Sequence, residues 1–317
     1  MPKCFEVLPF RFRFLTRAEV LFPPSGPANT YRGALGLILR RLACIPDCPG
    51  PRACPLRQTC PYARIFEPGG SGGPSGLKSW PRPFVIRAHD PHRLRIAQGE
   101  DFGFDLHLFD VHTPLVSHFV ESFRLMAEEG LGRGRGTAFL SSVELLDETG
   151  SPRRRVYEGS TLLTDPPHEP VLVDLSPSLA PVNRMVVRFV TPTELKGGED
   201  LLEPPEFSRL LARARDRVAT LCSLYGAGPL GIDFKGLGER AARVGMVHSS
   251  SRRVRAERRS SKTGQVHPIG GFTGEAEYEG DLGEFLPYLQ AARWTGVGRQ
   301  TTWGKGAIEI EARTAAH

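Results

Sequence analysis

The feature that most constrains the fold is an internal repeat. Residues 114–128 have apolar side chains at helical spacing, and the glycine-arginine loop GLGRGRG follows them and leads into an apparent strand. Residues 282–294 show the same helical spacing, and GVGRQTTWGKG follows them and leads into a second strand. The same helix, loop and strand therefore occur twice, about 165 residues apart, and duplication of one fold explains this pattern.

Strand and helix patterns around each copy complete the same order of elements. Each half predicts β-α-β-β-α-β, the ferredoxin-like order that RNA-recognition modules share. The predicted fold class is therefore α+β, with two tandem ferredoxin-like domains, 1–180 and 181–317, each with an antiparallel sheet and helices on one face. Residues 145–182, rich in prolines and polar residues, are predicted to join the halves, with VLVDL as a candidate extra strand. The other expected elements are strands at 5–15, 83–88, 102–110, 183–195, 243–250 and 270–280 and helices at 30–43 and 207–225.

Length and composition agree with two ordinary globular domains. A chain of 317 residues fits two domains of about 150 residues each. With 40% hydrophobic and 24% charged residues, it contains no apolar run near the roughly 20 residues that span a bilayer. The first residues alternate regularly and carry charges, unlike a signal peptide. We expect a cytoplasmic protein with no membrane role.

The net charge of +6 is unevenly distributed. The segment 251–262 concentrates basic residues around a single acid, Glu257, and a second cluster lies at 153–155. A solvated loop is one interpretation of such a run. Several basic runs beside glycine-rich loops favour a polyanionic partner. The basic residues of the first segment are Arg252, Arg253, Arg255, Arg258, Arg259 and Lys262.

Four of the six cysteines lie close together in a predicted insertion at 44–62: Cys44, Cys48, Cys54 and Cys60. In a reducing cytoplasm, clustered cysteines favour a metal over disulfides. The spacing C-x3-C-x5-C-x5-C departs from the paired CxxC of common zinc modules, so zinc, an iron–sulfur cluster and no metal all remain open, with structural zinc preferred. Four cysteine ligands would leave no open coordination position, so such a metal would not be catalytic.

The closing pattern GVGRQTTWGKGAIEI, preceded by GGFTGEAEYEGDLGEFLPYL, resembles the C-terminal signature of CRISPR-associated pre-crRNA-processing endoribonucleases of the RAMP superfamily. GLGRGRG resembles the corresponding loop of their first half. YRGALGLILRRL followed by CPLRQTCPYARIFEP resembles a cysteine-bearing branch of this group. The resemblance covers nearly the whole chain. It implies a protein that binds CRISPR repeat RNA or crRNA, acts as a monomer or homodimer, and transfers its product to an effector complex.

The two glycine-arginine loops are the first predicted RNA-binding elements. Glycines let a main chain approach a ligand closely, exposed amides bind phosphate oxygens, and the neighbouring cations neutralise charge. A tight connection between helix and strand is the structural alternative. The glycines precede a strand, which disfavours a dinucleotide site. The predicted RNA-binding residues are Gly132, Arg133, Gly134, Arg135, Gly296, Gly298, Arg299, Gly304, Lys305 and Gly306, together with the basic residues of 251–262.

The resemblance implies metal-independent cleavage, in which the 2′-OH attacks the adjacent phosphate and leaves a 2′,3′-cyclic phosphate. This chemistry needs a base, an acid and a cation, and no cofactor. Members of the family often place a histidine in or just after the first helix, but residues 17–88 contain none. The candidate catalytic residues are therefore Tyr31, Arg32, Arg41 and His248.

Two other functions remain open at this point. A non-catalytic RAMP subunit that binds guide RNA within an effector complex would explain the missing histidine. A metal-dependent protein-interaction module built on the cysteines is the more distant alternative.

Overall fold

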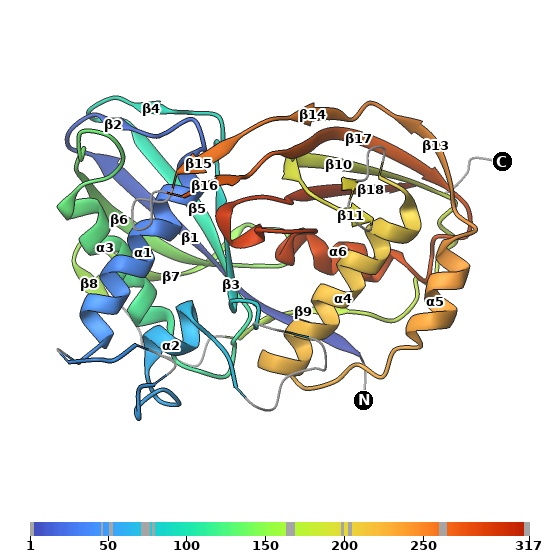
Figure 1. The fold of residues 1–317 in the computed structure, drawn as a ribbon, viewed down its shortest axis with the longest axis horizontal. Helices are drawn as coiled ribbons and strands as arrows, with labels where there is room; N and C mark the ends of the chain where they lie inside the picture. The colour runs from blue at the N-terminus through green and yellow to red at the C-terminus, as the bar shows by residue number, and fades with distance from the viewer. Residues whose placement is uncertain are drawn as a thin grey trace. The chain divides into compact units, whose positions relative to one another are not determined.

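The predicted duplication is present as two sheets with the same strand order (Figure 1). The computed structural model describes residues 3–45, 47–50, 53–70, 77, 80–162, 169–197, 200–201, 205–259 and 265–313. The chain divides into an N-terminal unit, Val7–Val171 with Leu224–Gly226, and a C-terminal unit, Met1–Glu6, Leu172–Ser223 and Ala227–His317.

The N-terminal unit contains a complete ferredoxin-like arrangement. Its central strands run in the order β3-β5-β1-β6, all antiparallel. Helix α1 connects β1 to β3 and helix α3 connects β5 to β6, which gives the order β-α-β-β-α-β. The bounds are β1 Cys4–Thr16, α1 Pro27–Ala43, β3 Phe84–Ala88, β5 Asp101–Leu108, α3 Val116–Glu129 and β6 Ala138–Leu146.

Alternation along β1 separates the two faces of this sheet. Phe10, Phe12 and Phe14 are fully buried, and α1 and α3 lie side by side on their face (Figure 1). The intervening Arg11 and Arg13 point to the opposite face, which no helix of the N-terminal unit covers in Figure 1. That face therefore presents polar side chains at sheet positions.

The C-terminal unit repeats the arrangement, with strands in the order β13-β17-β10-β18. Helix α4 follows β10, helix α6 follows β17, and both lie on one face of the sheet (Figure 1). The tandem ferredoxin-like prediction is therefore confirmed. The bounds are β10 Arg184–Thr193, α4 Phe207–Tyr225, β13 Gly245–Ser249, β17 Gly271–Glu279, α6 Leu286–Thr295 and β18 Ile308–Arg313, with β14 Arg252–Val254 also paired with β17.

Shorter elements decorate the two cores. The N-terminal unit adds α2 Pro61–Phe66 and the pair β2 Val20–Leu21 with β4 Arg95–Ile96. The C-terminal unit adds α5 Phe234–Ala241, the 3-10 turn η1 Thr301–Trp303, and the pairs β11 Lys196–Gly197 with β12 Asp200–Leu201 and β15 Glu257–Arg259 with β16 Val266–Pro268. No helix in the described part of the chain is long and apolar enough to cross a membrane.

The prediction that residues 145–182 only join the halves is wrong for their first part. β7 Pro152–Glu158 pairs with β6, and β8 Thr161–Leu162 pairs with β7, so they extend the first sheet. Val156 and Tyr157 are buried there. The sequence pattern does not predict this strand. Three consecutive arginines at 153–155 interrupt any alternation, and the two apolar residues that follow them are too few to indicate a strand. The candidate strand in VLVDL is confirmed as β9 Val171–Asp174, which pairs with β1.

Candidate functional site

The first glycine-arginine loop docks against β2 through its own backbone. The Leu131 amide donates to the Gly136 carbonyl at 2.8 Å, and the Arg133 amide donates to the Leu21 carbonyl at 2.7 Å. Gly132 has φ +64°, and a Cβ there would lie 2.1 Å from the Leu21 oxygen. Only glycine fits this position, because a side chain would displace the neighbouring backbone.

The second loop has the same hydrogen-bond pattern in the C-terminal unit. The Val297 amide donates to the Gly306 carbonyl at 2.9 Å, and the Arg299 amide donates to the Glu194 carbonyl at 3.2 Å. A Cβ on Gly298, at φ +79°, would lie 2.4 Å from the Glu194 oxygen. The repeat seen in the sequence is therefore one backbone motif built twice.

These contacts change the role predicted for the glycines. The amides of Arg133 and Arg299 are bonded to protein carbonyls, as are those of Gly296, Gly304 and Gly306. The expectation that these amides are bare for phosphate is therefore wrong, and the glycines instead admit close backbone contacts. The exposed guanidinium of Arg133 remains a candidate for phosphate, whereas Arg135 donates to the Glu129 carbonyl at 2.9 Å.

Lys305 has a different environment from the one predicted. Its side chain is 4% exposed, and its ammonium lies 3.0 Å from a Glu194 carboxylate oxygen and 2.9 Å from Oε1 of the Gln300 side chain. Burial lowers the pKa of Lys305, and the Glu194 carboxylate opposes this shift. A buried, paired ammonium cannot reach a phosphate in solvent, so Lys305 anchors the loop. Arg299, 56% exposed and 3.0 Å from the other Glu194 oxygen, is the accessible cation.

The basic segment adjoins this loop. Exposed Arg253 and Arg255 line a groove of about 330 Å³ whose wall includes Glu194. The Gln300 side-chain amide donates to the Pro268 carbonyl at 3.4 Å, which ties the loop to β16. Two motifs separated in the sequence therefore meet on one surface of the C-terminal unit.

The rest of the basic segment is only partly described. Arg252 is exposed, and its Nε lies 3.5 Å from the Thr273 hydroxyl. For Arg258 and Arg259 the structure describes the backbone alone, paired with β16. Lys262 lies outside the described residues.

Tyr31, a candidate base, lies in the aromatic core. It is 2% exposed, and its ring packs against Phe22, Phe102 and Phe104. Burial raises its pKa, so the phenol stays protonated. This environment favours a packing role over proton abstraction, although the ring also lines the pocket described below.

The other catalytic candidates each have their own environment. The Arg32 guanidinium lies 4.6 Å from the centre of the Phe66 ring. Arg41, more than two turns further along α1, forms an ion pair with Glu129 of α3. His248 is exposed on β13, in the other unit, opposite Glu277. Within the N-terminal unit, Tyr31, Arg32 and Arg41 are therefore engaged in three separate contacts.

The clustered cysteines approach one another without forming a metal site. The Gly50 amide lowers the pKa of Cys48, which also interacts with the thiols of Cys44 and Cys54. Burial raises the pKa of Cys44, which also interacts electrostatically with Cys60. Thiolates suit zinc. Among the described residues, however, no set of three histidine, cysteine or acidic side chains is placed to hold a metal. The structure does not support zinc, which stays a prediction from the spacing.

A pocket of about 440 Å³ lies in the N-terminal unit, where β1 and β3 end and β5 begins, near the start of α1. Aromatic side chains, among them Phe22, Tyr31 and Phe102, form part of its lining. Polar groups form the rest: Arg13, His89, Asp90, Arg93, Asp101 and Ser141. An apolar wall with a few convergent polar groups is typical of a ligand site.

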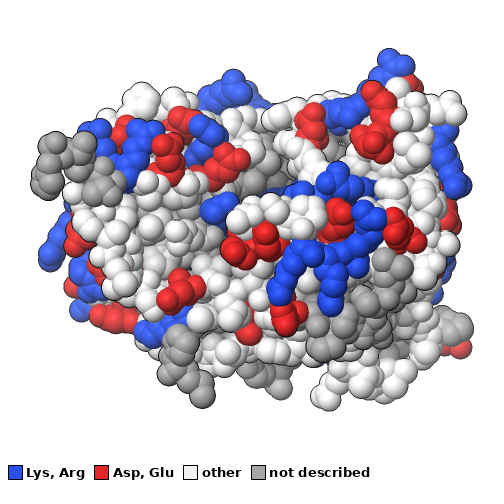
Figure 2. All heavy atoms as spheres, turned by 180° about the vertical axis from the view of Figure 1, so that it is seen from behind, with Lys and Arg blue, Asp and Glu red and all other residues white. Residues whose placement is uncertain are grey.

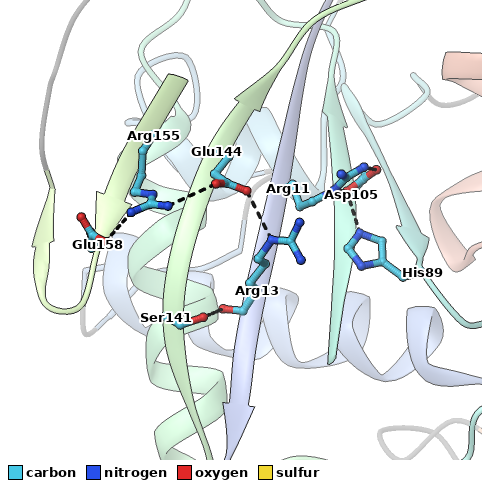
Figure 3. A network of polar contacts seen from close by, with 8 residues as sticks. All are labelled: Arg11, Arg13, His89, Asp105, Ser141, Glu144, Arg155 and Glu158. Carbon is cyan, nitrogen blue, oxygen red and sulfur yellow. Dashed lines mark hydrogen bonds and ion pairs between the residues drawn. The ribbon is translucent and has the colours of Figure 1, made fainter. Parts of the chain in front are cut away.

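His89 in this pocket is held by a carboxylate. Its Nε2 lies 2.7 Å from Oδ1 of Asp105, and Arg11 donates two bonds of 2.8 Å to the same carboxylate (Figure 3). Burial raises the pKa of Asp105, but the bonds from Arg11 and His89 outweigh it and hold the pKa at about 2. Asp105 is therefore ionised and can only accept, so Nε2 carries the proton and Nδ1 of the neutral ring has the lone pair.

Arg13 extends the polar network toward β6. Its Nε lies 3.3 Å from Glu144, and the Ser141 hydroxyl donates to its carbonyl at 2.9 Å (Figure 3). The β1–β6 register shifts between Arg13 and Phe14, and such bulges are frequent next to active sites. Figure 2 shows basic side chains with acidic side chains beside them on one face of the protein.

The Asp105 network predicts a measurable pH dependence of stability. A carboxyl whose pKa is about 2 when folded and about 3.9 when unfolded contributes roughly 2 to 3 kcal/mol above pH 4. That contribution is lost as the pH falls from about 4 to 2. Urea unfolding of the wild type and of Asp105→Asn should show a flatter pH dependence for the variant in this range. Parallel curves would contradict this assignment.

The sequence prediction does not include His89, because His89 directly follows residues 17–88, the stretch in which the family resemblance implies a histidine. The sequence nevertheless contains a signal, at Gly103, that another group approaches β5 closely. Gly103 interrupts the apolar and polar alternation of β5, and a Cβ there would lie 3.0 Å from His89 Nδ1. A glycine within a strand often marks a close approach by another group.

Two ferredoxin-like units, each with a glycine-arginine loop before its last strand, define a tandem ferredoxin-like protein. A family model described as an N-terminal domain, AF_1859_N, matches residues 5–169. A second model, described as CRISPR-associated endoribonuclease Cas6, matches residues 187–308. The chain belongs to the CRISPR-associated endoribonuclease Cas6 family.

Solved structures share this fold at low sequence identity. A Cas6 product complex has a TM-score of 0.55 at 18% identity, over 96% of this chain and 99% of that one. A Thermus thermophilus Cas6 has a TM-score of 0.53 at 16% identity, over 96% and 98%. A partial Cas6-RT-Cas1–Cas2 complex matches at 0.57 and 14%, over 100% of this chain and 48% of that one. No curated protein sequence matches the chain.

Proposed function

We propose that this chain binds CRISPR repeat RNA and cleaves it at one site to release crRNA. Membership of the Cas6 family supports this activity. The product, still bound to the basic surface, is then available to an effector complex. Binding of a polyanion through such a surface weakens steeply as salt rises.

The observation that carries the proposal is the junction in the C-terminal unit. The second glycine-arginine loop, the groove and the basic segment share Glu194 and the Gln300–Pro268 contact. Three exposed arginines, Arg253, Arg255 and Arg299, therefore belong to one surface. Guanidinium groups bind phosphates and guanine edges in a bidentate manner, as a folded repeat RNA requires.

The proposed reaction is transfer of the phosphate to the neighbouring 2′-oxygen. The 2′-oxygen forms a bond to phosphorus, the bond to the 5′-oxygen breaks, and the products carry a 2′,3′-cyclic phosphate and a 5′-OH. A base accepts the 2′ proton, the leaving oxygen gains one, and a cation stabilises the charge on the phosphorane.

Incubation of the purified protein with a transcript of its CRISPR repeat, in excess EDTA, tests this function. We expect one cut, with fragments that resist labelling at the 3′ end until the cyclic phosphate is opened. Replacement of the scissile 2′-OH by 2′-H should abolish cutting without loss of binding. Cutting that EDTA abolishes would contradict the mechanism, and no cutting of any repeat transcript would contradict the activity.

The second candidate function is a non-catalytic subunit that binds guide RNA. The absence of histidine from residues 17–88 and the burial of Tyr31 favour it. Tight binding of the repeat transcript without cleavage would support this alternative.

A further inference from the structure

We propose that the pocket at the end of the first sheet receives the nucleotide at the cleaved bond, and that His89 transfers the 2′ proton there. This inference rests on the proposed function and adds a catalytic residue outside the helix where the resemblance placed one. It depends on three neighbouring strands that bring His89 and Arg13 to one side of the sheet.

The position of the two residues follows from the strand register. Arg13 of β1 is opposite Gly103 of β5. The His89 amide donates to the Gly103 carbonyl at 3.2 Å from the other side. Strands are spaced about 4.8 Å apart, so the two main chains lie roughly 10 Å apart with the bare Gly103 between them. Their side chains therefore line a shared hollow.

The orientation of His89 suits a general base. Asp105 accepts from Nε2, so Nδ1 is the basic nitrogen, and it lies over Gly103, another residue of the pocket lining. A carboxylate in this position also stabilises the imidazolium that forms when the 2′ proton arrives. Nδ1 takes that proton while the 2′-oxygen bonds to phosphorus, and the leaving 5′-oxygen takes a proton from water.

Arg13 supplies the cation beside His89. Its side chain is 50% exposed, and its only ion pair among the described residues is through Nε to Glu144. The terminal nitrogens therefore face solvent and can bind two phosphate oxygens. The aromatic wall, partly formed by Phe102, offers a surface on which a base stacks.

Charged groups of both signs surround the His89–Asp105 pair. Asp90 is engaged by the amides of His92 and Arg93, and Arg93 forms an ion pair with Glu100. The charged residues around the His89–Asp105 pair are Arg11, Arg13, Asp90, Arg93 and Asp101.

Single-turnover cleavage of the repeat transcript by variants tests the proposal. His89→Gln should lower the rate by about 10²- to 10⁴-fold, with RNA affinity nearly unchanged. His92→Ala, three residues further on and exposed, is the matched control and should cut like the wild type. In Asp105→Asn the rise of rate with pH should move to lower pH, because the carboxylate no longer stabilises the imidazolium. A merely structural role of the pair would leave the position of this rise on the pH axis unchanged.

The outcomes separate this inference from the proposed function. Wild-type cleavage with an equally fast His89→Gln variant overturns the catalytic assignment and leaves the function intact. If the wild type binds but does not cut, the imidazole signals of 15N-labelled protein decide whether the pocket is a nucleotide site. A His89 signal that does not change on adding RNA overturns the inference entirely.

Discussion

Glu194→Gln is expected to destabilise the C-terminal unit by about 3 kcal/mol, because it leaves the buried Lys305 ammonium without its carboxylate. The Glu194 carboxylate also pairs with Arg299, and the Glu194 backbone carbonyl accepts a hydrogen bond from the Arg299 amide. Loss of the carboxylate should therefore also loosen the second glycine-arginine loop. Burial raises the pKa of Glu194, but Lys305 and Arg299 reverse this and keep the pKa low. Urea unfolding followed by tryptophan fluorescence measures the loss.

Two variants control this prediction. Glu279→Gln removes an exposed pair with Arg184 and should cost less than about 1 kcal/mol. Glu194→Gln combined with Lys305→Met removes both buried charges and should recover much of the loss. If the double variant is less stable than Glu194→Gln alone, the unpaired Lys305 ammonium is not the cause of the lost stability, and the anchoring role is wrong.

Gly132→Ala is expected to unfold the first glycine-arginine loop and cost about 3 kcal/mol or more. Alanine at φ +64° is strained by roughly 1 to 2 kcal/mol. Its Cβ would also lie 2.1 Å from the Leu21 oxygen, so the Arg133–Leu21 hydrogen bond must open. Thermal unfolding and hydrogen exchange of the Arg133 amide measure the two effects.

Gly134→Ala is the matched control in the same loop. Its φ of +79° is similarly unfavourable for alanine, but a Cβ there meets no atom within 4 Å. We expect the strain alone, about 1 kcal/mol. Equal losses for the two variants would show that backbone contact with β2 does not explain the glycine at 132.

Much of the fold could be predicted from periodicity. Alternation in β1, with Phe10, Phe12 and Phe14 on one face, and helical stripes in α1 and α4 are local patterns that burial preserves. β7 could not be predicted this way, because its partner β6 supplies the pairing that three consecutive arginines conceal. Strand pairing is a non-local property, so local composition is a weak guide to it.

The site shows the same division. The glycines and arginines of the two loops could be located, but not whether their amides and cations face solvent. Lys305 and Arg299 are basic residues of one loop, and both pair with Glu194, which follows β10. Only Arg299 is exposed, because the Lys305 side chain is buried where it meets the Glu194 carboxylate. The catalytic candidates on α1 were implied by the resemblance to the family, and the burial of Tyr31 does not favour a catalytic role for that residue.

The sequence by itself determined the duplicated α+β order, the position of both glycine-arginine loops and the basic segment 251–262, because periodicity, glycine and charge are properties of neighbouring residues. Only the tertiary structure decided which polar groups meet. Arg11 and Arg13 lie on β1, Asp105 lies on β5 and His89 directly follows β3, and the register of these three strands brings the four residues together. Burial then decides which charged groups pair within the protein and which remain accessible to a ligand.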